Sequence, residues 1–258
     1  MARKIFYYSK LTDDLVQSQH QDYQLPDDYQ WQVHGKGQLL FQHLVRLVAL
    51  LVAFVYTRLI RGVKIVDHAK LKDYQNQGYV VYSNHTQPVN DVFMPFLIGG
   101  YAHFYALAAP ANWGLPVLGK LLKFGGAIPT GSNRTQLQSM IAAINQALAS
   151  QGHLFIYPEA HVWPSYPKIR PFAQTAFRFP VVNQVPVFAM TTTYQGRRWT
   201  GQPKLVVYLD GPFVAPADLK PKSQQAWLHD QVLSQMKKRA QLSTYQQYQY
   251  QAKETEAK

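Results

Sequence analysis

Residues 78–91, GYVVYSNHTQPVND, hold a histidine and a carboxylate at a spacing suited to acid–base chemistry. The apolar run over residues 79–82 predicts a buried strand, and Pro88 is typical of the first turn of a helix, where its missing N–H costs nothing. His85 then falls in a strand-to-helix turn. Because strand carboxyl ends face the ligand crevice of an open α/β sheet, His85 is placed to act as a base. Asp91, about one turn into the helix, can orient its imidazole. The alternative is a turn histidine followed by an Asp that favours a helix N-terminus.

In three later segments, an apolar run that predicts a strand leads into polar residues. Residues 125–134, GGAIPTGSNR, end in Arg134, residues 153–161, HLFIYPEAH, contain Glu159, and VPVFAMTTTY begins at Val185. Between Asp91 and Asp210 the sequence has one carboxylate, Glu159, against nine Lys and Arg. A solvated surface normally mixes both signs of charge, so this span favours a site for an anion.

In this order and at these separations, the four segments resemble those of the 1-acylglycerol-3-phosphate acyltransferases and related glycerolipid acyltransferases. The resemblance covers about residues 63–212. That family has an Asn-His pair with an Asp five positions after the His, a block ending in Arg, a Phe-Pro-Glu-Gly-Thr-Arg block and a Val-Pro-Val-like strand. The matching positions here are Asn84, His85, Arg134, Pro158, Glu159 and Pro186.

The first block departs from the family by one residue. Asn90 stands where the family has its Asp, and Asp91 follows it. An extra residue can be absorbed in the turn before the helix, so we take Asp91 as the partner of His85 and keep Asn90 as the weaker alternative.

The third block lacks the family's cation. Ala160, His161 and Val162 stand in place of Gly, Thr and Arg. Lys168 and Arg170, a few residues later, are the candidates to replace the missing charge. This departure and the shifted Asp leave an alternative open, namely a catalytically impaired relative that binds anionic lipid or a partner enzyme.

The resemblance implies transfer of a fatty acyl group from an acyl thioester to the hydroxyl of a lysophospholipid, with 1-acylglycerol-3-phosphate as acceptor. A hydroxyl is a poor nucleophile, and a general base such as His85 contributes about 10² to 10⁴ in rate. Asp91 would stabilise the imidazolium, as in hydrolase triads. The chain has no cysteine, no G-x-S-x-G and no H-E-x-x-H, so we expect direct transfer, no metal and no bound cofactor. Acyl carrier protein or coenzyme A would carry the acyl group as co-substrate.

The expected substrate-binding residues surround this pair. Guanidinium groups bind phosphate oxygens in bidentate fashion, which suits acceptor recognition. Glu159 is expected either to accept a hydrogen bond from the acceptor glycerol or to pair with Arg134. The set comprises Asn84, Arg134, Glu159, Lys168 and Arg170.

Charge and hydropathy indicate a lipid surface. The net charge is +12, which implies an anionic partner. We find no nucleic-acid recognition motif, so anionic membrane lipid is the expected partner and nucleic acid is not.

The apolar centre of residues 39–60 would span only about 15 Å as a helix, half of the ~30 Å hydrocarbon core. We expect an interfacial or half-embedded helix, with Arg46 snorkelling, over a short transmembrane or core helix. If the helix spans, the basic residues after it and the five Asp before it place the catalytic domain in the cytoplasm. The expected location is therefore the cytoplasmic side of the cell membrane, where acyl thioester donors are also found.

Alternating strand-like and helical patterns predict an α/β fold, a mostly parallel sheet flanked by helices on both faces, with an N-terminal membrane-associated helix. Expected strands are 79–83, 102–108, 126–129, 153–157, 185–193 and 204–209, and expected helices are 88–98, 114–123, 133–150, 170–180 and 223–241. The chain divides into a polar arm (1–36), the membrane-associated helix (37–62), an acyltransferase domain (63–215), and a C-terminal helix with a polar tail (216–258). We expect the tail, residues 243–258, to be disordered.

Overall fold

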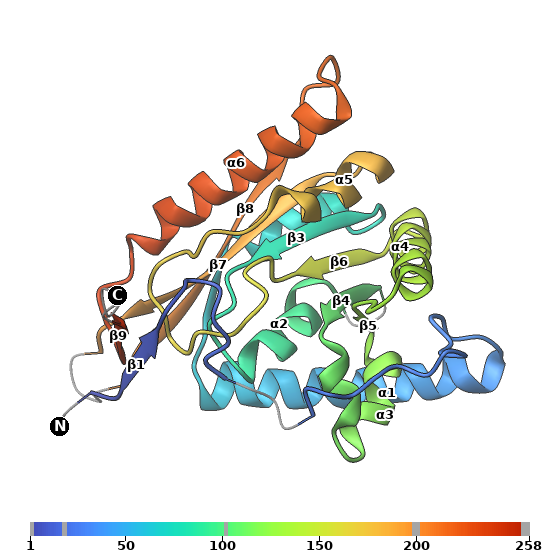
Figure 1. The fold of residues 1–258 in the computed structure, drawn as a ribbon, viewed down its shortest axis with the longest axis horizontal. Helices are drawn as coiled ribbons and strands as arrows, with labels where there is room; N and C mark the ends of the chain where they lie inside the picture. Colours follow the sequence, from blue (N-terminus) through green and yellow to red (C-terminus); the bar gives the residue numbers. More distant parts are fainter. Residues whose placement is uncertain (1–2, 17–19, 101–102, 198–201, 254–258) are drawn as a thin grey trace, which may run out of the picture.

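A seven-stranded sheet forms the centre of the computed structural model, which describes residues 3–16, 20–100, 103–197 and 202–253 (Figure 1). Its strand order is β2-β8-β7-β3-β6-β4-β5. The pair β7–β8 is antiparallel and the other five pairs are parallel. The predicted α/β class with a mostly parallel sheet is confirmed. The strands are β2 Lys64–Val66, β3 Tyr79–Ser83, β4 Phe104–Ala108, β5 Ala127–Pro129, β6 His153–Ile156, β7 Val187–Gln195 and β8 Lys204–Phe213.

Helices cover both faces of this sheet because its central strands are apolar on both sides. In β3, Tyr79 and Val81 join the core cluster under α1 and α2, whereas Val80 and Tyr82 join the cluster under α4 and α6. A strand buried on both faces reads as a continuous apolar run, as this one does. The helices are α1 Lys36–Phe54, α2 Asn90–Ile98, α3 Leu118–Gly125, α4 Arg134–Ala149, α5 Arg178–Asn183 and α6 Pro221–Ala240.

The first helix is long and presents apolar side chains to the outside. A π-helical turn, Val55–Ile60, extends α1, and among the described residues the combined helix Lys36–Ile60 is the one candidate for a membrane span by length and composition. It runs beneath α2 in Figure 1, and α3 lies across it. Its large exposed apolar residues are Leu39, Leu40, Phe41, Leu44, Leu47, Val48, Leu51, Val52, Phe54, Val55, Leu59 and Ile60.

Arg46 does not snorkel away from the domain, which corrects the expectation for this residue. It is 1% exposed, and its Nε donates to the carbonyl oxygen of Phe124 at 3.2 Å. Its guanidinium also lies 5.2 Å from the ring centroid of Phe104, a cation–π contact. Arg46 and Ala53 of α1 therefore face the domain, and its large apolar side chains face outward.

The two chain ends meet in a small sheet that the sequence did not predict. Strand β1, Ile5–Tyr8, pairs in parallel with β9, Gln249–Ala252, and the two lie side by side in Figure 1. The prediction of a disordered tail is therefore wrong for the part of it that the structure describes.

Local differences from the prediction are small. Pro88 lies in the turn before α2, which begins at Asn90. The expected helix over residues 170–180 is an irregular segment followed by a 3-10 turn, Gln174–Phe177, and the short α5. Further 3-10 turns are His68–Tyr74 and Pro110–Gly114.

Candidate active site

The loop between β3 and α2 is held by a single carboxylate oxygen. Asp91 Oδ2 lies 2.8 Å from His85 Nδ1 and accepts the backbone N–H groups of Thr86 at 3.0 Å and Gln87 at 2.9 Å. Asp91 is 1% exposed, so these three donors replace water at Oδ2, whereas Oδ1 is buried without a hydrogen-bond partner. The carboxylate thus shapes the turn and contacts the imidazole at the same time.

This contact fixes which ring nitrogen of His85 carries the proton. An ionised carboxylate only accepts hydrogen bonds, so Nδ1 must be the donor. In the neutral ring Nε2 is then unprotonated and able to accept a proton. The side chain of His85 is 20% exposed, unlike that of Asp91 at 1%. The arrangement is an accessible base with a buried orienting carboxylate.

Tyr157 supports the imidazole from one face. Its ring stacks on that of His85 with centroids 4.6 Å apart, and its hydroxyl donates to the backbone carbonyl oxygen of Asp91 at 2.6 Å. Burial, and secondarily the charge of Asp91, raises the pKa of the Tyr157 phenol well above its ordinary value. The phenol therefore stays protonated and keeps its hydrogen bond at neutral pH.

Glu159 holds the backbone of His85. Its Oε2 accepts the His85 N–H at 3.1 Å, its Oε1 accepts the Arg170 N–H at 2.9 Å, and Oε2 lies 3.0 Å from Arg170 Nη2. Burial raises the pKa of the Glu159 carboxyl, and the charge and hydrogen bonds of Arg170 act against that rise. Glu159 is 4% exposed and Arg170 is 1% exposed, so this is a buried ion pair.

Two further sets of hydrogen bonds attach the loop to its surroundings. The Asn84 amide donates to the carbonyl oxygen of Thr192 at 3.0 Å and accepts the Thr192 N–H at 2.9 Å, which extends the pairing of β3 with β7. On the other side, Trp163 N–H donates to the His85 carbonyl at 3.0 Å, and Ser165 N–H donates to the Thr86 carbonyl at 2.8 Å. His85 is held from both directions through main-chain atoms.

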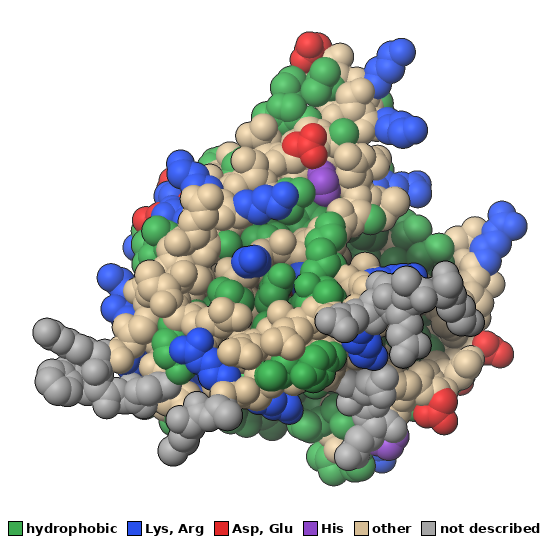
Figure 2. Space-filling view, turned by 60° about the vertical axis from the view of Figure 1, so that its left-hand side comes forward, with side chains coloured by type: hydrophobic (Ala, Val, Ile, Leu, Met, Phe, Trp, Pro, Cys, Tyr) green, Lys and Arg blue, Asp and Glu red, His purple; other side chains and the backbone are tan. Residues whose placement is uncertain are grey.

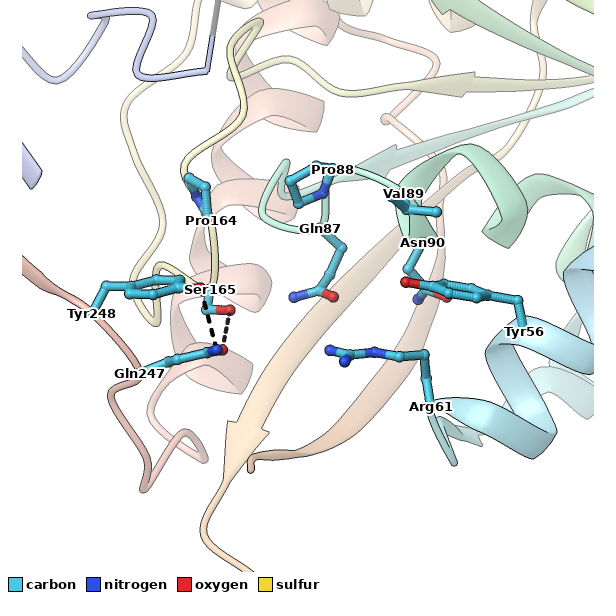
Figure 3. A pocket seen from close by; sticks show the side chains of 10 residues that line it. All are labelled: Tyr56, Arg61, Gln87, Pro88, Val89, Asn90, Pro164, Ser165, Gln247 and Tyr248. Atoms are coloured by element: carbon cyan, nitrogen blue, oxygen red, sulfur yellow. Dashed lines mark hydrogen bonds between the residues drawn. The ribbon is translucent and has the colours of Figure 1, made fainter. Parts of the chain in front are cut away.

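A pocket of about 220 Å³ adjoins this loop (Figure 3). Gln87, Pro88 and Asn90 form one wall. Tyr56 and Arg61, at the end of the long helix, form a second wall, and Pro164, Ser165, Gln247 and Tyr248 form the third. None of the ten residues that line the pocket is acidic.

Comparison with known proteins identifies the family to which the chain belongs. The family model described as Acyltransferase matches residues 63–193, slightly more than half of the chain. The chain belongs to the acyltransferase family. The predicted family resemblance is confirmed.

One solved structure similar to this acyltransferase is the 1-acyl-sn-glycerophosphate (LPA) acyltransferase PlsC from Thermotoga maritima. The TM-score is 0.58 at 13% sequence identity, over 81% of this chain and 90% of that chain. At this identity the likeness is one of fold. No curated protein sequence matches the chain.

Of the residues expected in the acyltransferase site, His85, Asp91, Glu159, Arg170 and Asn84 come together and two others do not. Arg134 is exposed at the start of α4, where it borders a separate pocket of about 410 Å³ with Asp27 and Asn133. Lys168 is exposed. Glu159 pairs with Arg170, not with Arg134, which corrects that alternative.

Asn84 and Arg170 were expected to bind substrate, and the structure corrects this assignment. Both polar atoms of the Asn84 side chain are taken by Thr192, and the Arg170 guanidinium is buried against Glu159 and the carbonyl oxygen of His161. These side chains position the loop. Tyr157 and Arg61 are the residues that sequence reasoning missed.

Among the described residues, no group of three or more His, Cys, Asp or Glu side chains is placed to hold a metal ion.

Proposed function

We propose that this acyltransferase moves a fatty acyl group from an acyl thioester to the free hydroxyl of a lysophospholipid, with 1-acylglycerol-3-phosphate as acceptor and phosphatidate as product. The observation that carries the proposal is the 2.8 Å contact between His85 Nδ1 and Asp91 Oδ2 in a loop at the carboxyl end of β3. The choice of acceptor draws on the family resemblance and on the activity of the PlsC enzyme whose structure is similar.

In the proposed reaction, Nε2 of His85 takes the proton of the acceptor hydroxyl as its oxygen attacks the thioester carbonyl carbon. A carbon–oxygen bond forms, and the carbonyl oxygen becomes an oxyanion. When the intermediate collapses, the carbon–sulfur bond breaks and the imidazolium returns the proton to the leaving thiolate. The products are an ester and a free thiol. Asp91 stabilises the imidazolium between the two proton transfers, which is the division of labour in hydrolase triads.

The proposed reaction also assigns the acyl donor and the exposed cations. Acyl carrier protein or coenzyme A would present the thioester, and no resident cofactor or metal takes part in any step. Arg134 and Lys168 are the exposed cations that we propose to meet the phosphates or the acidic carrier of the substrates.

We further propose that the enzyme works on the cytoplasmic face of the cell membrane. The outward apolar face of the helix Lys36–Ile60 supports a half-embedded position, because Arg46, Ala53 and Thr57 on its other side are buried against the domain. Lys and Arg side chains are spread across the face shown in Figure 2, where acidic side chains are fewer. Such a face suits anionic membrane lipids.

The test is acyl transfer by purified protein in lipid, with acyl carrier protein and coenzyme A thioesters offered to a panel of lysophospholipids and monoacylglycerol. We expect transfer to lysophosphatidate that disappears in His85→Ala. Absence of transfer with every pair of substrates, in a folded and lipid-bound wild type, contradicts the proposal and favours a relative that only binds lipid.

A further inference from the structure

The pocket beside the catalytic loop contains two buried hydrogen-bond donors without a partner. Arg61 Nε and Asn90 Nδ2 are both inaccessible to solvent and both lack a hydrogen-bond acceptor, and both residues line the pocket. Buried donors are almost always satisfied, and leaving one unpaired costs about 1–3 kcal/mol. Two such donors at one pocket indicate a ligand that supplies acceptor atoms.

Arg61 supplies a positive charge to this pocket. It ends the π-helical turn Val55–Ile60, where its backbone N–H donates to the carbonyl oxygen of Tyr56 at 2.8 Å. Figure 3 shows its side chain extending into the pocket toward Gln87 and Ser165. Within the described ranges no carboxylate forms an ion pair with it. An unneutralised guanidinium favours an anionic ligand.

Asn90 supplies a neutral donor close to Tyr56 and Arg61 (Figure 3). The residue is 1% exposed, and its Oδ1 accepts from Thr57 Oγ1 at 2.7 Å, so the amide is held with Nδ2 unused. An Asp at this position would instead place a negative charge at the pocket wall. The Asn therefore removes an obstacle to binding an anion here.

Other polar side chains that line the pocket already have hydrogen-bond partners. Gln247 Oε1 accepts from Ser165 Oγ at 2.8 Å, and its Nε2 donates to Tyr248 Oη at 3.3 Å. The Gln87 amide donates to Tyr194 Oη at 2.8 Å. These groups already have partners, which leaves Arg61 Nε and Asn90 Nδ2 as the buried unpaired donors among the residues that line the pocket.

We propose that this pocket binds the phosphate group of the acceptor lipid, an inference that rests on the proposed function. The volume of about 220 Å³ is below the roughly 300–1,000 Å³ of pockets for drug-sized ligands, so it fits a headgroup and not a whole lipid. Asn90 is one residue from Asp91, which brings a bound headgroup to the loop that carries His85. Arg61 would replace the cation missing from the third sequence block, where Val162 stands.

The position of the pocket also fits a lipid ligand. It opens beside the end of the helix Lys36–Ile60, whose outer face carries exposed apolar side chains such as Leu59 and Ile60. An acceptor with its acyl chain along an apolar surface and its phosphate at Arg61 would satisfy both features.

Binding is tested without catalysis, by calorimetric titration of short-chain lysophosphatidate, the matching monoacylglycerol and inorganic phosphate into His85→Ala protein with no acyl donor. We expect Arg61→Gln, added to that protein, to weaken lysophosphatidate binding about 10- to 100-fold. Asn90→Asp should also weaken it, because it keeps the acceptor for Thr57 and adds a negative charge. Monoacylglycerol binding should change with neither substitution.

Arg58→Gln is the matched control, because Arg58 lies on the same turn, is exposed and does not line the pocket. It should leave lysophosphatidate binding unchanged. Equal lysophosphatidate binding by the His85→Ala protein with and without Arg61→Gln or Asn90→Asp overturns the proposal. So does inorganic phosphate binding as tightly as lysophosphatidate with the same dependence on Arg61, since the pocket would then recognise free phosphate. Thermal unfolding of each variant shows whether it is folded, and Arg61→Lys, which keeps the charge, should recover part of the affinity.

The two proposals fail in different ways. Arg61-dependent lysophosphatidate binding in a wild type that transfers no acyl group contradicts the proposed function alone. Transfer that requires His85 but has an acceptor KM unaffected by Arg61→Gln contradicts the pocket alone.

Discussion

The carboxylate of Glu159 lies 3.1 Å from the backbone nitrogen of His85 and accepts its N–H, 74 residues away in sequence. The same carboxylate forms a buried ion pair with Arg170. Glu159 therefore acts on His85 through the main chain, and its side chain is closed off from a substrate.

This relationship predicts that Glu159→Gln affects stability before it affects substrate binding. Removing one partner of a buried ion pair leaves an uncompensated charge and costs about 3–5 kcal/mol. We expect a loss of that size in the free energy of urea unfolding, and a similar loss in Arg170→Gln. Replacing both residues together by Gln and Met should cost less than the sum of the single changes, because neither charge is left alone.

A different outcome at Glu159 would change its assignment. A Glu159→Gln protein with unchanged unfolding free energy and a raised acceptor KM would mean that the carboxylate contacts the substrate directly.

Substitutions of Asp91 and Asn90 are predicted to affect different kinetic constants. Asp91→Asn keeps the shape of the side chain but cannot stabilise an imidazolium, so kcat for acyl transfer should fall by about 10² to 10⁴. Asn90→Ala should leave kcat within a few-fold and act on the acceptor KM. The measurement is steady-state transfer with saturating donor. Equal losses of kcat at the two positions would contradict the pairing of His85 with Asp91.

Much of this site could be predicted from the sequence because its two central residues are close together along the chain. His85 and Asp91 are six residues apart, and a strand followed by a turn and a helix brings them together. The buried strands β3 and β6 could be predicted because they are mostly apolar runs in the sequence and are buried on both faces.

The rest depends on long-range packing that composition does not encode. The burial of Arg170 requires the N-terminal arm, whose Leu11 carbonyl oxygen accepts from Arg170 Nη1 at 3.3 Å. The pairing of β1 with β9 joins two segments nearly the full chain length apart. Arg61 was visible as a basic residue after an apolar helix, and only the packing of that helix places it beside Asn90.

Tyr157 is predicted to tune the loop modestly. Tyr157→Phe keeps the ring against His85 but removes the hydrogen bond to the Asp91 carbonyl, a loss of about 0.5–1.5 kcal/mol. We expect a reduction of kcat by up to about ten-fold and a small decrease in unfolding free energy. Tyr157→Ala, which also removes the stacked ring, should cost clearly more in both measurements. A Phe variant as damaged as the Ala variant would assign the effect to the hydroxyl and not to the ring.

The pH dependence of stability is predicted at the contact between β8 and α6. Burial acts to raise the pKa of the Asp210 carboxyl, but two hydrogen bonds from Arg239, at 2.6 and 2.8 Å, prevail and hold it below the ordinary value of 3.8. A carboxyl whose folded-state pKa is lowered stabilises the fold above its unfolded-state pKa, and this contribution is lost as the pH falls through the folded-state value. Urea unfolding of wild type and Asp210→Asn should therefore differ most at neutral pH and converge as the pH falls below about 4. Arg239→Gln should show the same convergence, and a difference that stays constant down to pH 2 would mean that the ion pair does not contribute through ionisation.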